Sequence, residues 1–160
     1  MKIFLGAGCA LAAAAGPAFA GSDTSSFTVN ATVIASCAVS ANDLQFGNYN
    51  PVADSDLDAA TTLSVACTNG TPFQIALGLG GGTGASTAAR YMTNGANTLA
   101  YTLYQDASRS TLWGETAGVD TKAGTGTGAA VSIDVYGRAP MHQTAPAGAY
   151  SDTIVVTVTY

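Results

Sequence analysis

The segment Thr153-Ile154-Val155-Val156-Thr157-Val158-Thr159-Tyr160 decides the fold class of this chain. β-branched residues occupy almost every position of the segment, and such residues favour strands. A run without regular polar alternation is typical of a strand that is buried on both faces. The sequence ends at Tyr160, so no later residues are left to cover the outer edge of this strand. Natural proteins normally cover a flat apolar edge, and we therefore expect another segment to pair with it.

Further short β-prone runs precede this segment, and none of them shows sustained helical periodicity. They are separated by Gly, Asn, Asp and Pro, a pattern typical of a β-sandwich or barrel. The runs are Leu63–Thr68, Phe73–Leu79, Leu99–Gln105 and Val131–Tyr136, with a turn predicted at Asn69–Pro72. Two Gly-rich stretches match no nucleotide-binding fingerprint and are predicted to be loops, namely Gly78–Gly84 and Gly124–Gly128. The sequence therefore predicts an all-β fold.

The first twenty residues have the features of a signal peptide. Lys2 supplies a positive charge, Ile3–Ala15 is an apolar run, and Ala18-Phe19-Ala20 fits an A-x-A cleavage site. The apolar run is shorter than the roughly 20 residues that cross a bilayer, so we expect no membrane insertion. We predict that residues 1–20 are removed and that Gly21–Tyr160 is exported as one domain.

The mature chain is acidic and carries few charges. Without Lys2, four of the five basic residues remain against ten acidic ones, which gives a net charge near −6. Nucleic acids and anionic membrane surfaces are bound through clusters of basic residues. We therefore expect neither as a partner. A surface with few long charged side chains is suited to packing against copies of itself.

Two cysteines, Cys37 and Cys67, remain after cleavage of the signal peptide. An isolated pair in an exported protein is typical of one disulfide bond. The alternatives are two free thiols or half of a metal site. Neither cysteine has a nearby histidine or a C-x-x-C partner, which favours the disulfide.

The sequence offers little for catalysis. His142 is the one histidine and Glu115 the one glutamate, and no G-x-S-x-G motif marks a nucleophilic serine. Nucleophilic catalysis needs a base beside the nucleophile. His142 lies between Pro140 and Pro146, where we expect an exposed loop. We therefore predict that the protein is not an enzyme and binds no cofactor.

Asp54, Asp56 and Asp58 form a D-x-D-x-D cluster that could supply oxygen ligands to calcium. An EF-hand loop would need Gly and Glu where this chain has Ala59 and Val65. The other interpretation is a polar turn between strands, in which Asp bonds to the nearby backbone. We favour the turn and predict no metal site.

Several stretches, taken in order along the mature chain, resemble the spore coat protein U domain family. This family comprises subunits of archaic chaperone–usher pili and of related spore-coat layers. The stretches are Ala35–Val39, Asn42–Tyr49, Leu63–Gly70, Leu99–Asp106, Leu112–Gly114, Val135–Arg138 and Ala147–Thr153 running into the final strand. Each stretch is short, but together they cover nearly the whole mature chain.

The resemblance implies an incomplete immunoglobulin-like β-sandwich that lacks its last strand. It implies residues 21–34 as an N-terminal donor-strand extension and residues 35–160 as the pilin-like domain. A groove for the donor strand of another subunit would then lie beside the final strand, lined by Ile154, Val156, Val158 and Tyr160. Phe27, Val29, Ala31 and Val33 alternate onto one face and are the expected donor residues. We expect Phe27 and Val29 to be buried deepest.

The resemblance also implies partners and a location. A periplasmic chaperone would fill the groove first, and at an outer-membrane usher the donor strand of another subunit would replace it by β-strand addition. The product would be a fibre or coat on the cell surface. The alternatives are an ordinary edge strand at Phe27–Val33, and a self-completed coat or carbohydrate-binding adhesin domain. In an adhesin, Leu112-Trp113-Gly114 could stack on a sugar, although a core position is the commoner use of Trp.

Overall fold

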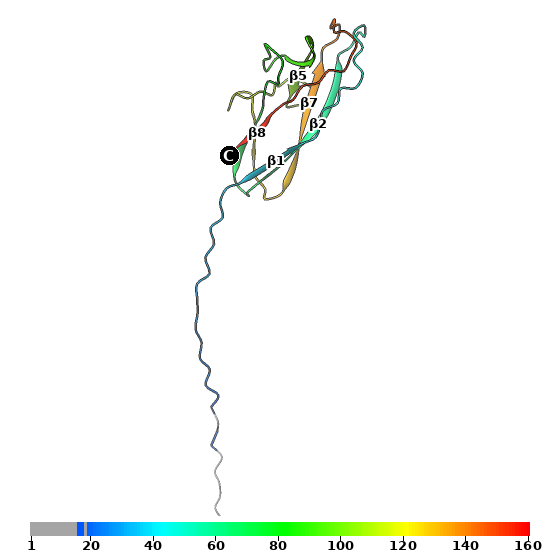
Figure 1. Ribbon diagram of the computed structural model, residues 1–160. Helices are drawn as coiled ribbons and strands as arrows, with labels where there is room; N and C mark the ends of the chain where they lie inside the picture. The colour runs from blue at the N-terminus through cyan, green and yellow to red at the C-terminus, as the bar shows by residue number, and fades with distance from the viewer. Residues whose placement is uncertain (1–15, 18) are drawn as a thin grey trace, which may run out of the picture. The chain divides into compact units, whose positions relative to one another are not determined.

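Eight β-strands and no helix make up the described part of this computed structural model, which covers residues 16–17 and 19–160 (Figure 1). Most of the predicted signal peptide, residues 1–15 and 18, lies outside the described residues. The chain divides after Thr32, and residues 33–160 form the sandwich. In the described residues, no helix is long and apolar enough to cross a membrane. The prediction of an all-β fold is confirmed.

The larger sheet has five strands, and every neighbouring pair in it is antiparallel. Their order across the sheet is β1 (Cys37–Ala41), β2 (Leu57–Cys67), β7 (Ala130–Ala139), β5 (Asn97–Tyr104) and β4 (Arg90–Asn94). Along this sheet Val39 pairs with Val65, and Val65 pairs with Val131. These three valines therefore share the face that is turned toward the core, since Val65 is fully buried.

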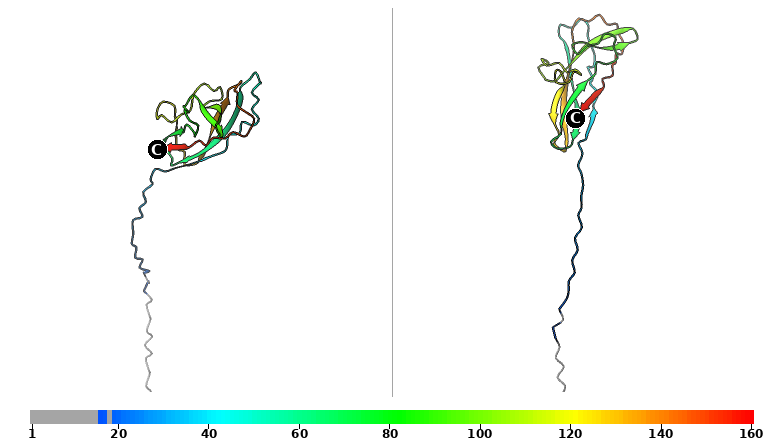
Figure 2. Two further views of the ribbon diagram at one scale, coloured as in Figure 1. Left: turned by 45° about the horizontal axis from the view of Figure 1, so that its top comes forward. Right: turned by 90° about the vertical axis from the view of Figure 1, so that its left-hand side faces the viewer.

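The smaller sheet has three strands and packs against the first. Its order is β6 (Lys122–Thr125), β3 (Pro72–Leu77) and β8 (Val156–Thr159), again with antiparallel neighbours. Because β3 lies in the middle, β8 pairs with one strand and forms an edge of the sheet. The right-hand view of Figure 2 shows the red β8 facing the cyan β1, which is itself the edge of the larger sheet.

The core lies between the two sheets and follows the alternation expected of strands. Leu63 and Val65 of β2 face Ile75 and Leu77 of β3, and all four are buried. Trp113, from the loop after β5, is fully buried among them, and its indole Nε1–H donates to the carbonyl of Ile75 at 2.9 Å. Since this Trp lies in the core, a sugar-stacking role for Leu112–Gly114 is wrong.

Besides the final strand β8, the sequence patterns found four of the strands, but they missed β4 and β6. The predicted runs correspond to β2, β3, β5 and β7, although β2 begins earlier, at Leu57. The strands β4 and β6 were not expected, and β6 includes Gly124, which was predicted to lie in a loop. Gly124 pairs with Phe73, and a Cβ built on it would lie 2.4 Å from the Phe73 ring. A glycine here lets an aromatic ring cover the strand, so in this case it does not mark a loop.

The disulfide between Cys37 and Cys67 is confirmed. The two cysteines face each other in the register of β1 and β2, so the bond joins neighbouring strands of the larger sheet. A cross-link that closes a loop of this length stabilises a fold by roughly 3–4 kcal/mol, mainly by restricting the unfolded chain.

Candidate functional site

The segment that leads into β8 crosses from one sheet to the other. Ser151 exchanges two backbone hydrogen bonds with Thr93 of β4, in the larger sheet. Four residues later Val155 accepts a hydrogen bond from the Gly78 N–H, and β8 then pairs with β3 in the smaller sheet. The regular strand is consequently short, because the residues before Val156 span the space between the sheets.

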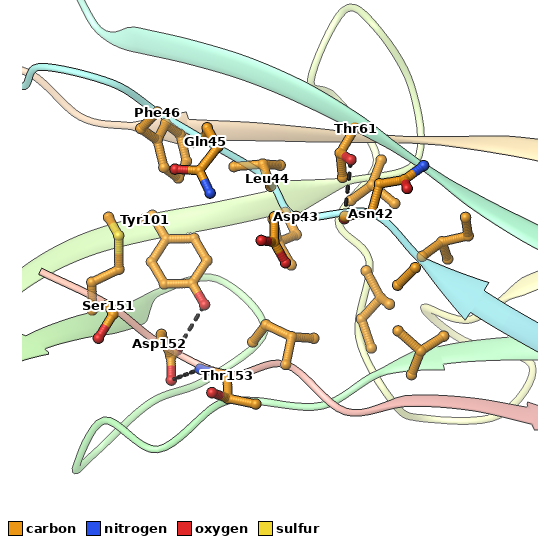
Figure 3. Close-up of a pocket in the computed structure, with 18 of the residues that line it drawn as sticks. Asn42, Asp43, Leu44, Gln45, Phe46, Thr61, Tyr101, Ser151, Asp152 and Thr153 are labelled. Atoms are coloured by element: carbon orange, nitrogen blue, oxygen red, sulfur yellow. Dashed lines mark hydrogen bonds between the residues drawn. The ribbon is translucent and has the colours of Figure 1, made fainter.

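Asp152 holds this crossing in place. Its carboxylate accepts hydrogen bonds from the Tyr101 hydroxyl at 2.7 Å, the Gly81 N–H at 2.8 Å and its own neighbour Thr153 N–H at 2.8 Å. Figure 3 shows the Tyr101 ring pointing toward this carboxylate. Burial raises the pKa of Tyr101, and the hydrogen bond to Asp152 raises it further, so the phenol stays protonated as a donor. Gly80 lies so close to Asp152 that a Cβ at that position would collide with the carboxylate.

The burial of β8 differs from the sequence prediction. Ile154, Val156 and Val158 are half-buried, whereas Val155 is 66% exposed and Tyr160 is 58% exposed. The expectation of a strand buried on both faces is therefore wrong. The physical reason is that, among the described residues, no second layer covers the outer face of the smaller sheet, so only alternate residues of β8 reach the core.

A cavity of about 440 Å³ opens between the crossing segment and the chain that follows β1 (Figure 3). Residues 41–46 form one wall, and residues 150–154 with Val156 form the other. The deep surface is largely apolar and consists of Leu63, Leu77, Met92, Leu103 and Val135. We call this cavity, together with the unpaired edge of β8, the edge groove.

The edge groove narrows toward the end of the sandwich that holds the disulfide. There Cα atoms of β1 and β8 approach within 8 Å, yet in the described residues no backbone hydrogen bond joins the two strands. A strand inserted between them would need two strand spacings, about 9–10 Å. Val39 and Val131, on the core-facing side here, are 38% and 39% exposed. A strand inserted along the full length of the edge groove would therefore move β1 and β8 apart and cover these two valines.

The predicted groove residues are only partly brought together. Ile154 and Val156 line the cavity, and Val158 packs against the core further along β8. Tyr160 lies outside the cavity lining and is mostly exposed. The residues of the larger sheet that form the deep surface, such as Leu103 and Val135, were not predicted as part of the site. The sequence showed that these residues alternate toward the core. It did not show that one end of the core stays open.

The predicted donor residues lie in a segment that forms no strand in the described chain. Phe27, Val29 and Val33 are 88%, 80% and 83% exposed, and Ala31 is exposed as well. The alternative that Phe27–Val33 is an ordinary edge strand is therefore not what this structure shows. An exposed run with a Phe and two Val on alternate positions leaves considerable apolar surface in water.

The acidic cluster is engaged by side chains and backbone groups of the same end of the sandwich. Asp58 receives two hydrogen bonds from Arg138, at 2.7 and 2.9 Å, and this hydrogen bonding lowers the pKa of the Asp58 carboxyl. Asp56 accepts from the backbone N–H of Met141, and Asp54 contacts His142 at 3.1 Å. Arg138 also lies 3.4 Å from Asp56, so its guanidinium bridges two of the three carboxylates. Across residues 16–17 and 19–160, no three metal-ligating side chains gather in one place.

The comparisons with known proteins agree with this architecture. A sequence profile of the Spore Coat Protein U domain matches residues 23–157. Protein U of Myxococcus xanthus is 36% identical over 159 residues, covering 90% of this chain and 88% of that protein.

A similar fold occurs in the crystal structure of the CsuC-CsuE chaperone-tip adhesion subunit pre-assembly complex from archaic chaperone-usher Csu pili of Acinetobacter baumannii. The superposition has a TM-score of 0.58 at 22% identity. It covers 81% of this chain and 40% of the matched chain, so this chain spans less than half of that one. The predicted sandwich of the pilin type is confirmed by this likeness of fold.

Proposed function

Because this chain belongs to the Spore Coat Protein U domain family, we propose that it is a structural subunit of an exported pilus or coat. We propose further that subunits join by donor-strand exchange, with residues 21–34 of one copy inserted into the edge groove of the next. The role is structural and non-enzymatic. The observation that carries the proposal is the one-sided pairing of β8 beside an open apolar cavity.

The energetics of insertion support this occupant. An unpaired strand edge presents backbone N–H and C=O groups that a further strand can satisfy. Each new backbone hydrogen bond contributes about 1 kcal/mol. Burial of a Phe and a Val side chain contributes roughly 3–6 kcal/mol more. The exposed Phe27 and Val29 have this apolar surface to bury, and the edge groove has apolar walls to receive it.

The same open groove accounts for the proposed partners. A subunit with an uncovered apolar edge is an aggregation hazard in the periplasm. We propose that a periplasmic chaperone covers the edge groove until an outer-membrane usher replaces it with the next subunit. The chaperone–subunit complex named above has a subunit fold of this kind, which is consistent with such a partner. The predicted signal peptide provides for export, and the assembled fibre or coat would lie at the cell surface.

A pair of double variants tests the donor segment. Phe27→Asp together with Val29→Asp places two charges on the face proposed to enter the groove, and we expect it to abolish polymers while leaving chaperone binding intact. Thr28→Asp with Asn30→Asp adds the same charge on the opposite face of the strand and is expected to polymerise. Polymers would be counted on unheated denaturing gels of protein co-expressed with its chaperone and usher. Normal polymerisation of the first variant would contradict the proposed donor face.

A further inference from the structure

Thr68 holds the chain at the point where the sandwich begins. Its hydroxyl accepts a hydrogen bond from the Ser36 N–H at 3.1 Å and lies 3.2 Å from the carbonyl of Ile34 and 3.3 Å from that of Ser36. The Thr68 N–H also donates to the Ser36 carbonyl at 2.9 Å. The half-buried Thr68 side chain therefore contacts the N–H and the carbonyl of Ser36 and the carbonyl of Ile34. These groups lie immediately before Cys37 of the disulfide.

The support beneath Thr68 is itself closely packed. The Gly126 Cα approaches so near that a Cβ on it would lie 2.3 Å from the Thr68 carbonyl oxygen. Gly126 exchanges two backbone hydrogen bonds with the turn, because its N–H donates to the Thr71 carbonyl at 2.7 Å and its carbonyl accepts from the Gly70 N–H at 2.8 Å. Gly128 donates to the carbonyl of Cys67 at 3.1 Å. The turn that carries Thr68 is thus anchored to the loop after β6 and offers a rigid platform.

The position of this platform matters because almost no chain separates it from the donor segment. Val33 is the last proposed donor residue, and Ile34, the next residue, already has its carbonyl held by Thr68. Each residue contributes two soft backbone dihedrals. Ile34 is therefore the joint between the proposed donor segment and the sandwich, and the hydrogen bond from Thr68 to its carbonyl restricts its backbone rotation.

We propose that Thr68 is a positioning residue that fixes the direction in which the donor segment leaves the sandwich, and thereby the angle between successive subunits. The inference rests on the proposed function, because a donor segment must link two subunits for the angle to matter. It does not concern the strength of the linkage, since Thr68 lies at the root of the segment and outside the cavity lining.

The test compares three variants in the full exported chain. Thr68→Val keeps the shape of the side chain and removes the hydroxyl, whereas Thr68→Ser retains the hydroxyl and should restore wild-type behaviour. Thr71→Val is the matched control, since Thr71 lies in the same turn and contributes backbone hydrogen bonds to it. The first readout is amide hydrogen exchange at Ser36 in the monomer. Loss of the hydroxyl acceptor is expected to speed this exchange roughly 5–10-fold in Thr68→Val alone.

The second readout is the spread of angles between neighbouring subunits in fibres imaged by electron microscopy. We expect Thr68→Val to form as much polymer as wild type but with a broader distribution of angles, and Thr68→Ser and Thr71→Val to match wild type. An unchanged distribution in Thr68→Val fibres would overturn the inference and leave the proposed function standing. Failure of the wild-type chain to polymerise at all would overturn both.

Discussion

At the scale of single residues, the most unusual group is the buried guanidinium of Arg90. It is fully buried and donates to the carbonyls of Leu77, Gly78 and Trp113, at distances of 2.7 to 2.9 Å. Burial lowers the pKa of Arg90, yet a guanidinium remains charged under all ordinary conditions. These carbonyls belong to the end of β3 and to the core Trp loop. Arg90 therefore satisfies three carbonyl acceptors where β3 ends beside the Trp113 loop.

We predict that Arg90→Met lowers the free energy of unfolding by at least about 3 kcal/mol, because it leaves several buried carbonyls without a hydrogen-bond donor. Arg138→Met is the matched control. Its guanidinium is part-exposed and pairs with Asp58, so the loss should be at most about 1 kcal/mol. Urea denaturation of the monomer measures both values. A small loss for Arg90→Met would mean that water reaches these carbonyls readily.

The ion pair between Asp58 and Arg138 predicts a dependence of stability on pH. The hydrogen bond from Arg138 lowers the pKa of Asp58, and the nearby charge of Arg109 adds to this effect. A carboxyl with a lowered folded-state pKa contributes stability above its unfolded pKa, near 4, and loses it as the pH falls through the folded value. We therefore expect wild type to be more stable than Asp58→Asn at pH 6, where the difference in unfolding free energy reaches its largest value.

Below about pH 4 that difference should shrink. Both proteins should still lose stability in acid through Asp106, because the Ser108 hydroxyl and neighbouring N–H groups lower the pKa of its carboxyl too. Denaturation of both proteins at pH 6, 4 and 3 provides the comparison. A difference that stays constant across this range would show that the ion pair does not contribute through the charge of Asp58.

At the scale of elements, β8 connects the sandwich to its proposed assembly. Adjacent residues of this segment have opposite environments, since Val156 lines the cavity while Val155 is exposed on the outer face. Alternation of this kind follows from the strand geometry and from having core on one face only. The element is therefore able to offer both an apolar wall and a free backbone edge.

This alternation predicts different effects for neighbouring substitutions. Val156→Ser should reduce the yield of polymer several-fold, because it replaces part of the apolar wall of the edge groove by a hydroxyl. Val155→Ser should leave the yield unchanged. Thermal unfolding followed by circular dichroism would establish that both monomers are folded before polymer is measured. Equal yields from the two variants would argue against Val156 as part of the acceptor wall.

Much of the fold was readable from the sequence, and the exceptions have physical causes. Periodicity identified β2, β3, β5 and β7, whose alternate residues meet the core. The strand β4 escaped because it begins with Arg90, and a charged residue does not ordinarily indicate a core position. The strand β6 escaped because its glycine pattern indicates a loop unless the Phe73 ring above it is known.

The site was less predictable than the fold. The final strand was indicated by its β-branched residues, and the proposed donor segment by its alternation and by the family resemblance. The deep surface was not, because Leu63, Leu103 and Val135 look like any inward-facing residues of a strand. Whether a core is open at one edge depends on where chain crossings occur. The crossing at Asp152 relies on contacts with Tyr101 and Gly81, which are 51 and 71 residues away.

At the scale of the whole molecule, the contacts that hold the sandwich together lie within residues 33–160. The disulfide joins β1 to β2, and the buried Trp113 and Arg90 join the loops to β3. None of these contacts involves residues 21–32. A subunit that lacks this segment should therefore fold and still accept a donor strand, but it should be unable to supply one.

The most direct test of the account is a denaturing gel of exported protein, run unheated and heated, for wild type and for a form that lacks residues 21–32. Both forms would be co-expressed with the chaperone and usher. We predict an unheated ladder from the wild type that collapses to monomer on boiling, and no ladder from the truncated form. A ladder from the truncated form, or a wild type that remains monomeric, would contradict donor-strand exchange through this segment.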